Sequence, residues 1–429
     1  MLILLKNARI LKMTDENIVS GSIVIKDNRI IYIGNDYESY GPFDVIKDCH
    51  QNLLMPGFKN SHAHGPMTFL RSAADSASLH DWLFDNVFPR EKYLTPESVY
   101  AFHKIAILEY ISSGITCSFE QYYFPIASGK AASELGFRTV LLGTFNPLQN
   151  RVKDLSRLYH EYNDVKDPLI TYSYGIHAEY TTNEEEISAM KEACDKDKAR
   201  FYLHIAETKS EVENCINNRH MTPVEFIYSK GLMEYGGAGF HSIYLNDHDI
   251  ELYKNNNFSV VTCPGSNSKL ASGIAPIRKY LENGINVALG TDGPASNNSL
   301  DMFKEMQLLN ALENIYYQDP MAIKPFDILK MATVNGSKVM NLKDIDTLEV
   351  NKIADIIEID LHAANMQPIN NIISNLVYSG NKGNVILTMI NGKIVYENGK
   401  YYIDEDIDKI YAEAEKYKLE IEKKFKENL

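Results

Sequence analysis

The sequence has few cysteines, and no two of them are spaced as in a redox or metal motif. Its five cysteines are scattered, and none belongs to a Cys-x-x-Cys pair. The odd number and the spacing argue against a disulfide framework and against a thiolate zinc site. The thiols are most simply read as buried small side chains or inert surface groups, and a reducing cytoplasm is the expected location.

Positive charge and long apolar runs are also scarce. The 429 residues include 43 Lys and Arg against 57 Asp and Glu, a net charge of −14. Nucleic-acid binding usually needs a basic surface, so we expect no nucleic-acid partner. No basic block indicates an anionic membrane surface, and no apolar run approaches the roughly 20 residues that span a bilayer. The first residues lack the features of a signal peptide. We therefore expect a soluble enzyme with small-molecule partners and no membrane partner.

Short strand patterns occur near both ends of the chain. Residues 22–33 read as two strands joined by Asp27-Asn28, and residues 385–395 contain Asn391-Gly392, a strong hairpin signal. Each piece alone is short for a stable sheet. We therefore predict one small β-sandwich built from residues 1–55 and 346–403, followed by a solvated surface helix over 404–429.

Between these ends, apolar runs alternate with helical patterns. The runs are the segment before His62 (53–58) and then 115–120, 139–144, 169–176, 200–206, 237–242, 258–263 and 286–291. Helix signals lie between them, for example Thr95-Pro96 and the capping box that starts at Thr222. Eight strand–helix units predict an α/β fold, a (β/α)₈ TIM-type barrel over residues 56–345, with a doubly wound sheet as the alternative.

Polar residues cluster at the predicted strand ends, where a barrel of this type carries its active site. His62 and His64 follow the first strand, and alternate residues of a strand point to the same face. His204 and Glu207 close the fifth strand, and His241 and Asp292 close the sixth and eighth. A single buried histidine is usually a core residue, but this constellation predicts a site that suits a divalent transition metal.

Several longer motifs resemble those of the amidohydrolase superfamily, and within it the 5-methylthioadenosine/S-adenosylhomocysteine deaminase branch, near guanine deaminases and s-triazine hydrolases. The motifs are Met55-Pro56-Gly57-Phe58-Lys59-Asn60-Ser61-His62-Ala63-His64, Pro66-Met67-Thr68-Phe69-Leu70-Arg71, His204-Ile205-Ala206-Glu207-Thr208, the segment from Cys263 to Gly273, and Thr291-Asp292-Gly293-Pro294-Ala295-Ser296-Asn297-Asn298. The resemblance extends from the first strand to about residue 400.

The resemblance implies a metal-dependent aminohydrolase. The implied ligands of one metal ion, zinc or alternatively iron, are His62, His64, His204 and Asp292. His177 stands where two-metal relatives carry a bridging lysine, which favours a single ion, and such an ion lowers the pKa of a bound water to about 7.

The resemblance also implies the catalytic roles. Glu207 would act as general acid and base, Asp292 would also hydrogen-bond the attacking oxygen, and His241 would hold that oxygen or polarise the carbon under attack.

The resemblance also implies contacts to the substrate, from residues at matching positions. Glu91 would accept ribose hydroxyls, Arg151 would bind a homocysteine carboxylate, and His177 would lie near the ribose or purine. Ser296 would place a hydroxyl beside the site, and Trp82, the only tryptophan, would stack on a heterocycle or pack between a loop and the barrel.

The resemblance predicts hydrolytic deamination of an adenine nucleoside or thioether nucleoside: methylthioadenosine, S-adenosylhomocysteine, 5′-deoxyadenosine or adenosine. Departures from the branch pattern occur around the pocket, at Ser118-Phe119-Glu120, after His241 and at Gly265. The alternatives are a free-base deaminase of the guanine type, an s-triazine-type hydrolase, and a binding module that holds a metal without turnover. The resemblance also implies a homo-oligomer, a dimer or tetramer.

Overall fold

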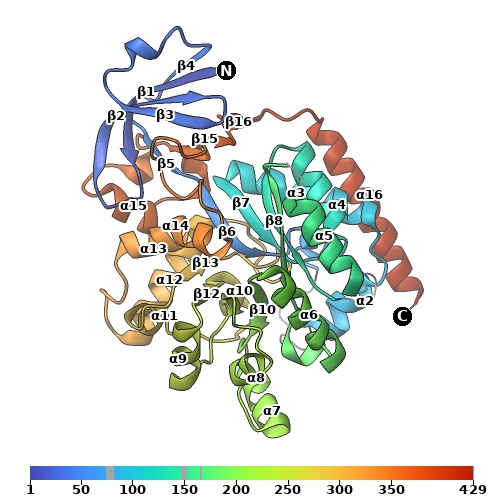
Figure 1. The fold of residues 1–429 in the computed structure, drawn as a ribbon. Coiled ribbons are helices and arrows are strands. Elements are labelled where there is room, and N and C mark those ends of the chain that lie inside the picture. Colours follow the sequence, from blue (N-terminus) through green and yellow to red (C-terminus); the bar gives the residue numbers. More distant parts are fainter. Residues whose placement is uncertain (74–81, 146–151, 165–166, 429) are drawn as a thin grey trace.

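The computed structural model describes residues 1–73, 82–145, 152–164 and 167–428. A barrel forms the body of the molecule, and a separate sheet caps one end of it near the N-terminus (Figure 1). Within the described ranges, eight strands form one parallel sheet in sequential order, as predicted for a (β/α)₈ barrel. The barrel strands are β6 (Phe58–Ala63), β7 (Ile115–Glu120), β8 (Arg138–Gly143), β9 (Ile170–Gly175), β10 (Phe201–Ile205), β11 (Gly237–His241), β12 (Phe258–Thr262) and β13 (Val287–Leu289).

The first and last barrel strands meet just beyond their ends. Asp292, which follows β13, donates its backbone N–H to the carbonyl of His62 over 3.0 Å, and a parallel bridge joins Ala63 to Asp292. Helices surround the strands: α3 (Pro96–Ser112), α4 (Pro125–Glu134), α5 (Val152–Asp164), α6 (Glu184–Asp197), α7 (Lys209–Arg219), α8 (Pro223–Ser229), α9 (Asp247–Asn255), α10 (Pro264–Lys269), α11 (Ile277–Glu282), α12 (Met302–Tyr317), α13 (Pro325–Met331) and α14 (Val334–Val339).

Both ends of the chain contribute to the second sheet, as predicted. It consists of β1 (Leu2–Leu11), β2 (Ile18–Lys26), β3 (Arg29–Gly34), β4 (Val45–Asp48), β5 (Leu53–Pro56), β14 (Ile356–Ile359), β15 (Val385–Ile390), β16 (Lys393–Glu397) and β17 (Lys400–Tyr401). The strand order is β17-β16-β15-β14-β5-β1-β2-β3, with β4 beside β1. The antiparallel pairing of β5 with β14 joins the N-terminal strands to the C-terminal ones.

The apolar run 53–58 does not form the first barrel strand, which is a correction to the sequence reading. Leu53–Pro56 is β5 of the mixed sheet, and the barrel strand β6 starts only at Phe58. Gly57 lies between them, and a Cβ at this glycine would approach the side chain of Thr116 to 2.1 Å. The chain therefore passes from one sheet to the other at a residue that has no room for a side chain.

Local signals in the sequence act as predicted. Thr95 caps α3 by accepting a hydrogen bond from the backbone of Ser98, and Gly114 follows that helix with φ +80°. Asn391 and Gly392 both have positive φ in the turn between β15 and β16, as a two-residue hairpin loop with the favoured twist requires.

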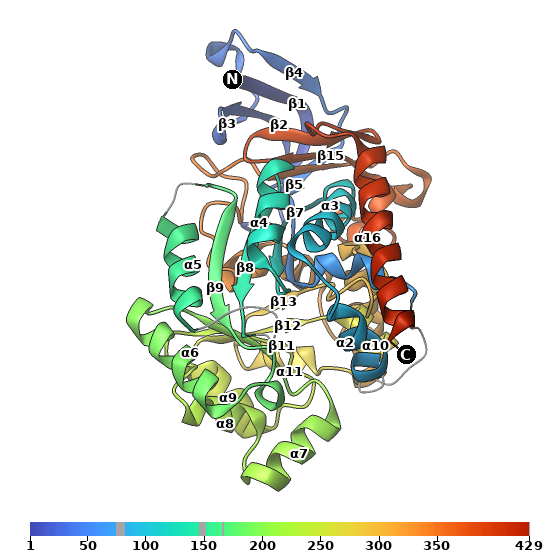
Figure 2. The same cartoon turned by 90° about the vertical axis from the view of Figure 1, so that its right-hand side faces the viewer.

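Helix α16 (Ile407–Glu427) near the C-terminus is not solvated all round, in contrast to the prediction. Ile410, Ala414 and Ile421 are buried on one face, and the helix runs along α3 towards α2 in both views (Figures 1 and 2).

The remaining elements are short: η1 (Glu38–Tyr40), η2 (Gly65–Leu70), the π-helical turn η3 (Trp82–Val87), α2 (Phe88–Glu91), η4 (Glu179–Thr181), η5 (Ala364–Met366), α15 (Ile372–Tyr378) and η6 (Lys382–Asn384). In the ranges described, no helix combines the length and apolar character needed to cross a bilayer.

Candidate active site

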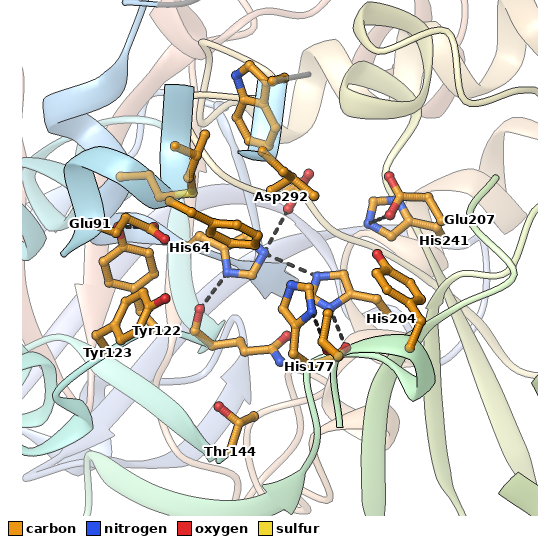
Figure 3. Close-up of a pocket in the computed structure, with 18 of the residues that line it drawn as sticks. His64, Glu91, Tyr122, Tyr123, Thr144, His177, His204, Glu207, His241 and Asp292 are labelled. Carbon is orange, nitrogen blue, oxygen red and sulfur yellow. Dashed lines mark hydrogen bonds and ion pairs between the residues drawn. The ribbon is translucent and has the colours of Figure 1, made fainter. Parts of the chain in front are cut away.

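A group of histidines and one aspartate converges at the carboxyl ends of the barrel strands (Figure 3). His62 is the fifth residue of β6, His64 follows β6, and His204 is the fourth residue of β10. His241 ends β11, and Asp292 follows β13. One ligand atom each from His62, His204, His241 and Asp292 lie within 4.8 Å of one another, and all four residues are buried.

His64 belongs to the same group. Its Nε2 lies 3.1 Å from Asp292 Oδ1 and 3.3 Å from His204 Nε2. His62 Nε2 lies 3.3 Å from the same oxygen of Asp292. The structure therefore brings together all four residues that the resemblance implied as ligands. It also places His241 nearby as a fifth residue that could bind a metal ion.

Backbone carbonyls fix the orientation of two of these imidazoles. His64 Nδ1 donates to the carbonyl of Gln121 over 2.5 Å, and His204 Nδ1 donates to the carbonyl of His177 over 2.8 Å. With Nδ1 protonated, the neutral form of each ring presents an Nε2 lone pair, and the two Nε2 atoms lie 3.3 Å apart. Metal-ligating histidines commonly use the second nitrogen in this way.

The donors fit a divalent transition metal. His62 is fully buried, and neither of its ring nitrogens has a hydrogen-bond partner among the described residues. Burial lowers the pKa of His62 to about 3, so the ring is neutral at neutral pH and can donate a lone pair. A buried polar atom without a partner is costly, and a metal ion would satisfy it. Imidazole and carboxylate ligands suit zinc and ferrous iron.

Asp292 is held by two serines. Ser266 and Ser296 each donate a hydroxyl to Asp292 Oδ2 over 2.6 Å, which leaves Oδ1 facing the histidines. Burial opposes ionisation of Asp292, but the imidazoles of His62 and His64 beside its Oδ1 hold its pKa well below the usual range. The predicted substrate residue Ser296 thus has its hydroxyl directed at a proposed metal ligand.

Glu207 lies beside this group, on the loop that follows β10. Its carboxylate is 3.9 Å from His241 Nε2 and 3.5 Å from the hydroxyl of Ser272. Burial raises its pKa, which suits a carboxyl group that takes and returns a proton.

Glu211 fixes the loop that carries Glu207. Its half-buried carboxylate accepts hydrogen bonds from the backbone N–H groups of Ala206 at 2.7 Å, Glu207 at 2.8 Å and Thr208 at 3.4 Å. Ala206 has a left-handed backbone with φ 51°, a conformation that costs a non-glycine residue about 1–3 kcal/mol. Three hydrogen bonds to one carboxylate stabilise this turn and so orient Glu207.

His241 is oriented by Asn267. Its Nδ1 lies 2.7 Å from Asn267 Oδ1, and it too has a left-handed backbone, with φ 66°. The bond to Asn267 directs Nε2 towards Glu207 and the proposed metal ligands.

The site opens into a cavity of about 420 Å³. The wall includes Trp82, Glu91, His177, Glu207, His241 and Asp292, together with apolar side chains such as Val87, Phe88 and Leu270. His177 contacts the ring of His204, with centroids 4.8 Å apart, and its Nδ1 is 3.0 Å from the hydroxyl of Thr181. Trp82 is buried in the cluster that surrounds η3 and α2. Arg151 lies outside the described residues.

Glu91 stands on the wall of the cavity, on α2. Tyr122 donates its hydroxyl to Glu91 Oε1 over 2.6 Å, and these two residues lie close together in Figure 3. Burial raises the pKa of Glu91 to about 7, although the hydrogen bond from Tyr122 acts in the opposite direction. A buried carboxylate in a mostly apolar cavity can accept hydrogen bonds from a polyol.

Four residues of the site were missed in the sequence analysis: Glu211, Asn267, Ser266 and Tyr122. Glu211 had a signal, because it stands three residues after Thr208 in a capping-box spacing. Asn267 and Ser266 lie in the segment from Cys263 to Gly273, but nothing in its spacing indicates which side chain their polar atoms contact.

Comparisons with known proteins show the family of the chain. The model of the amidohydrolase family matches residues 53–395. The chain is 35% identical over 422 residues to a 5-methylthioadenosine/S-adenosylhomocysteine deaminase of Caldanaerobacter subterraneus subsp. tengcongensis, covering 96% of this chain and 97% of that one. It is 35% identical over 423 residues to a 5′-deoxyadenosine deaminase of Methanobrevibacter smithii, with the same coverage.

Among solved structures, an adenosine deaminase from Xanthomonas campestris with bound zinc superposes with a TM-score of 0.92. It is 28% identical, and the superposition covers 98% of each chain. The family match covers most of this sequence, and the relatives cover nearly all of it. The chain belongs to the amidohydrolase family.

Proposed function

We propose that the protein is a metal-dependent hydrolytic deaminase that acts on an adenine nucleoside or thioether nucleoside and releases ammonia. One observation carries the proposal: the carboxylate of Glu207 and the cluster of histidines and Asp292 share one cavity with the buried carboxylate of Glu91. The first two suit hydrolysis, and the third suits a substrate with hydroxyl groups. The names of the relatives support the substrate class.

We propose His62, His64, His204 and Asp292 as the ligands of one metal ion. The ion would act as a Lewis acid and activate water for attack. Zinc is the proposed ion, because the relative from Xanthomonas campestris holds zinc, and ferrous iron is the alternative.

Glu207 is the proposed proton carrier. It would remove a proton from the attacking water and deliver it to a ring nitrogen of the purine, so that the amino-bearing carbon accepts the oxygen. Its neighbour His241 would hold the attacking oxygen through Nε2, the nitrogen left free by the bond of Nδ1 to Asn267. Asp292 Oδ1 would hydrogen-bond the same oxygen.

Glu91 is the proposed ribose contact. It would accept hydrogen bonds from the ribose hydroxyls, while the hydrogen bond from Tyr122 to Oε1 holds its carboxylate in place. His177 and Trp82 line the same cavity and are proposed to contact the nucleoside, and Ser296 supports Asp292. Arg151 stays a predicted contact for a substrate carboxylate.

A substrate panel tests the function. Purified, zinc-loaded protein is assayed for ammonia release from adenosine, methylthioadenosine, 5′-deoxyadenosine, S-adenosylhomocysteine and guanine, and its metal content is measured on the same sample. We expect release from at least one adenine nucleoside and none from guanine. Release from guanine alone would reject the nucleoside assignment, and no release from any of them would reject the deaminase.

We also propose a homo-oligomer of two or four chains, on the strength of the family resemblance. Light scattering on the purified protein measures the mass directly. A monomer at micromolar concentration would reject this proposal.

A reducing compartment, the cytoplasm, is the proposed location. The cysteines at 49, 117, 194, 215 and 263 are all buried and free, which suits a protein that never needs disulfides. Microscopy of the tagged protein in its own cell tests the proposal, and export of the protein would reject it.

A further inference from the structure

Helix α2, which carries Glu91, cannot be stable by itself. It has four residues, Phe88–Glu91, and follows the π-helical turn η3. Helices this short gain almost nothing from their own hydrogen bonds. The position of Glu91 on the cavity wall must therefore depend on contacts that α2 makes with the rest of the protein.

One such contact comes from the far end of the chain. Arg90, the residue before Glu91, places Nε 2.7 Å from Glu422 Oε1, and its guanidinium carbon lies 3.9 Å from the centroid of the Phe425 ring. Arg90 Nη1 also donates to the carbonyl of Asn86 in η3 over 3.0 Å. Its side chain is only 12% exposed, so charge and stacking act on Arg90 with little competition from water.

The rest of α16 is fastened to the same region. Before the helix begins, Glu405 pairs with the nearly buried Lys104 of α3 at 2.5 Å. Ala414 and Ile421 belong to the apolar cluster that contains Trp82 and Val87, two residues that also line the cavity. The helix thus runs from α3 to α2, as Figure 2 shows.

We propose that α16 is a positioning element of the substrate cavity: Glu422 and Phe425 hold Arg90 and thereby fix Glu91 on the wall. The proposal rests on the proposed function for its link to ribose binding. The family match ends at residue 395, before α16 begins, so the family model does not assign this part of the chain a role in the site.

The test compares two double variants of the full-length, metal-loaded protein. Glu422→Ala with Phe425→Ala removes both contacts to Arg90. Leu419→Ala with Glu420→Ala removes similar atoms from an exposed face of the same helix and serves as the matched control. Glu422→Gln is a milder variant that keeps the shape of the side chain.

Hydrogen exchange is the first readout. We expect faster exchange of the amides of residues 82–94 in the Glu422/Phe425 variant, no change there in the control, and unchanged exchange in the barrel strands. Equal exchange of residues 82–94 in wild type and variant would overturn the proposal whether or not the protein is a deaminase. The absence of any nucleoside deaminase activity in the wild type would instead reject the proposed function.

Kinetics supply the second readout. We expect KM for the nucleoside to rise about tenfold, with a smaller effect on kcat and unchanged metal content. Because α16 acts through Glu91, the same double substitution should leave KM unchanged when it is added to Glu91→Gln. An equal increase of KM in the wild-type and Glu91→Gln backgrounds would overturn the proposal. A smaller increase of KM in Glu422→Gln, seen only when Glu91 is present, would support it.

Discussion

The buried carboxyl group of Glu91 should make the protein less stable as the pH rises. The residue is 4% exposed, and burial raises the pKa of its carboxyl group from 4.5 to about 7. The folded state therefore holds the proton more tightly than the unfolded state does. Stability linked to this group is greatest below about pH 4.5, falls as the pH rises, and becomes constant above about pH 7. Substitution by glutamine, which cannot ionise, removes this dependence.

The size of the effect follows from the shift in pKa. The raised pKa makes ionised Glu91 cost about 3 kcal/mol in the folded state at about pH 8 and roughly 1 kcal/mol at about pH 5.5. Relative to wild type, Glu91→Gln should therefore gain about 2 kcal/mol of stability between these two pH values. For a chain of this length, that corresponds to about 2 °C in Tm.

Thermal unfolding of metal-free wild type and Glu91→Gln at both pH values measures this difference. Glu192→Gln is the control, because Glu192 is exposed on α6 and solvated in the folded and unfolded states alike. Glu91→Gln, but not the control, should also raise KM for nucleosides. If the Tm difference between Glu91→Gln and wild type is the same at both pH values, Glu91 does not carry the ionisation described above.

Three further changes test the site. Glu207→Gln should keep the metal content and lower kcat by about 10²–10⁴-fold, because the proton carrier is lost; retained activity in an ammonia assay would reject the mechanism. Asn267→Ala frees Nδ1 of His241 and should lower kcat/KM about 10–100-fold with little change in KM, and an unaltered kcat would show that this bond does not orient the ring. Removal of the metal by a chelator should lower Tm, because His62 and Asp292 lie where the first and last barrel strands meet, and zinc should restore it. An unchanged Tm would mean that the metal adds nothing to barrel closure.

The barrel was predictable because each of its strands is a short apolar run bounded by turn signals. The same signal was misleading at 53–58, where two strands of different sheets follow each other without a polar interruption. An apolar run indicates that a strand is buried, but it does not indicate to which sheet the strand belongs. Only the step at Gly57, packed against Thr116, separates β5 from β6.

The proposed ligands could be read from the sequence because they occupy strand ends, whose position in a barrel is fixed by topology. Their supporting contacts could not. Asn267 reaches His241, and Ser266 reaches Asp292, only because β11, β12 and β13 lie side by side, so these pairs depend on tertiary packing. The buried face of α16 did have a local signal, the spacing of Ile410, Ala414 and Ile421 along one side of a helix, and it was masked by the many charged residues between them.

The pairing of β5 with β14 bears on the order in which the chain can fold during synthesis. The N-terminal strands leave the ribosome first, but one edge of β5 has no partner until Ile356–Ile359 has been made. An unpaired strand edge is a template for association with other chains, and contacts between residues far apart in sequence form late. The nascent chain thus carries an open edge of β5 throughout synthesis of the barrel, and any chain that ends before β14 keeps that edge unpaired.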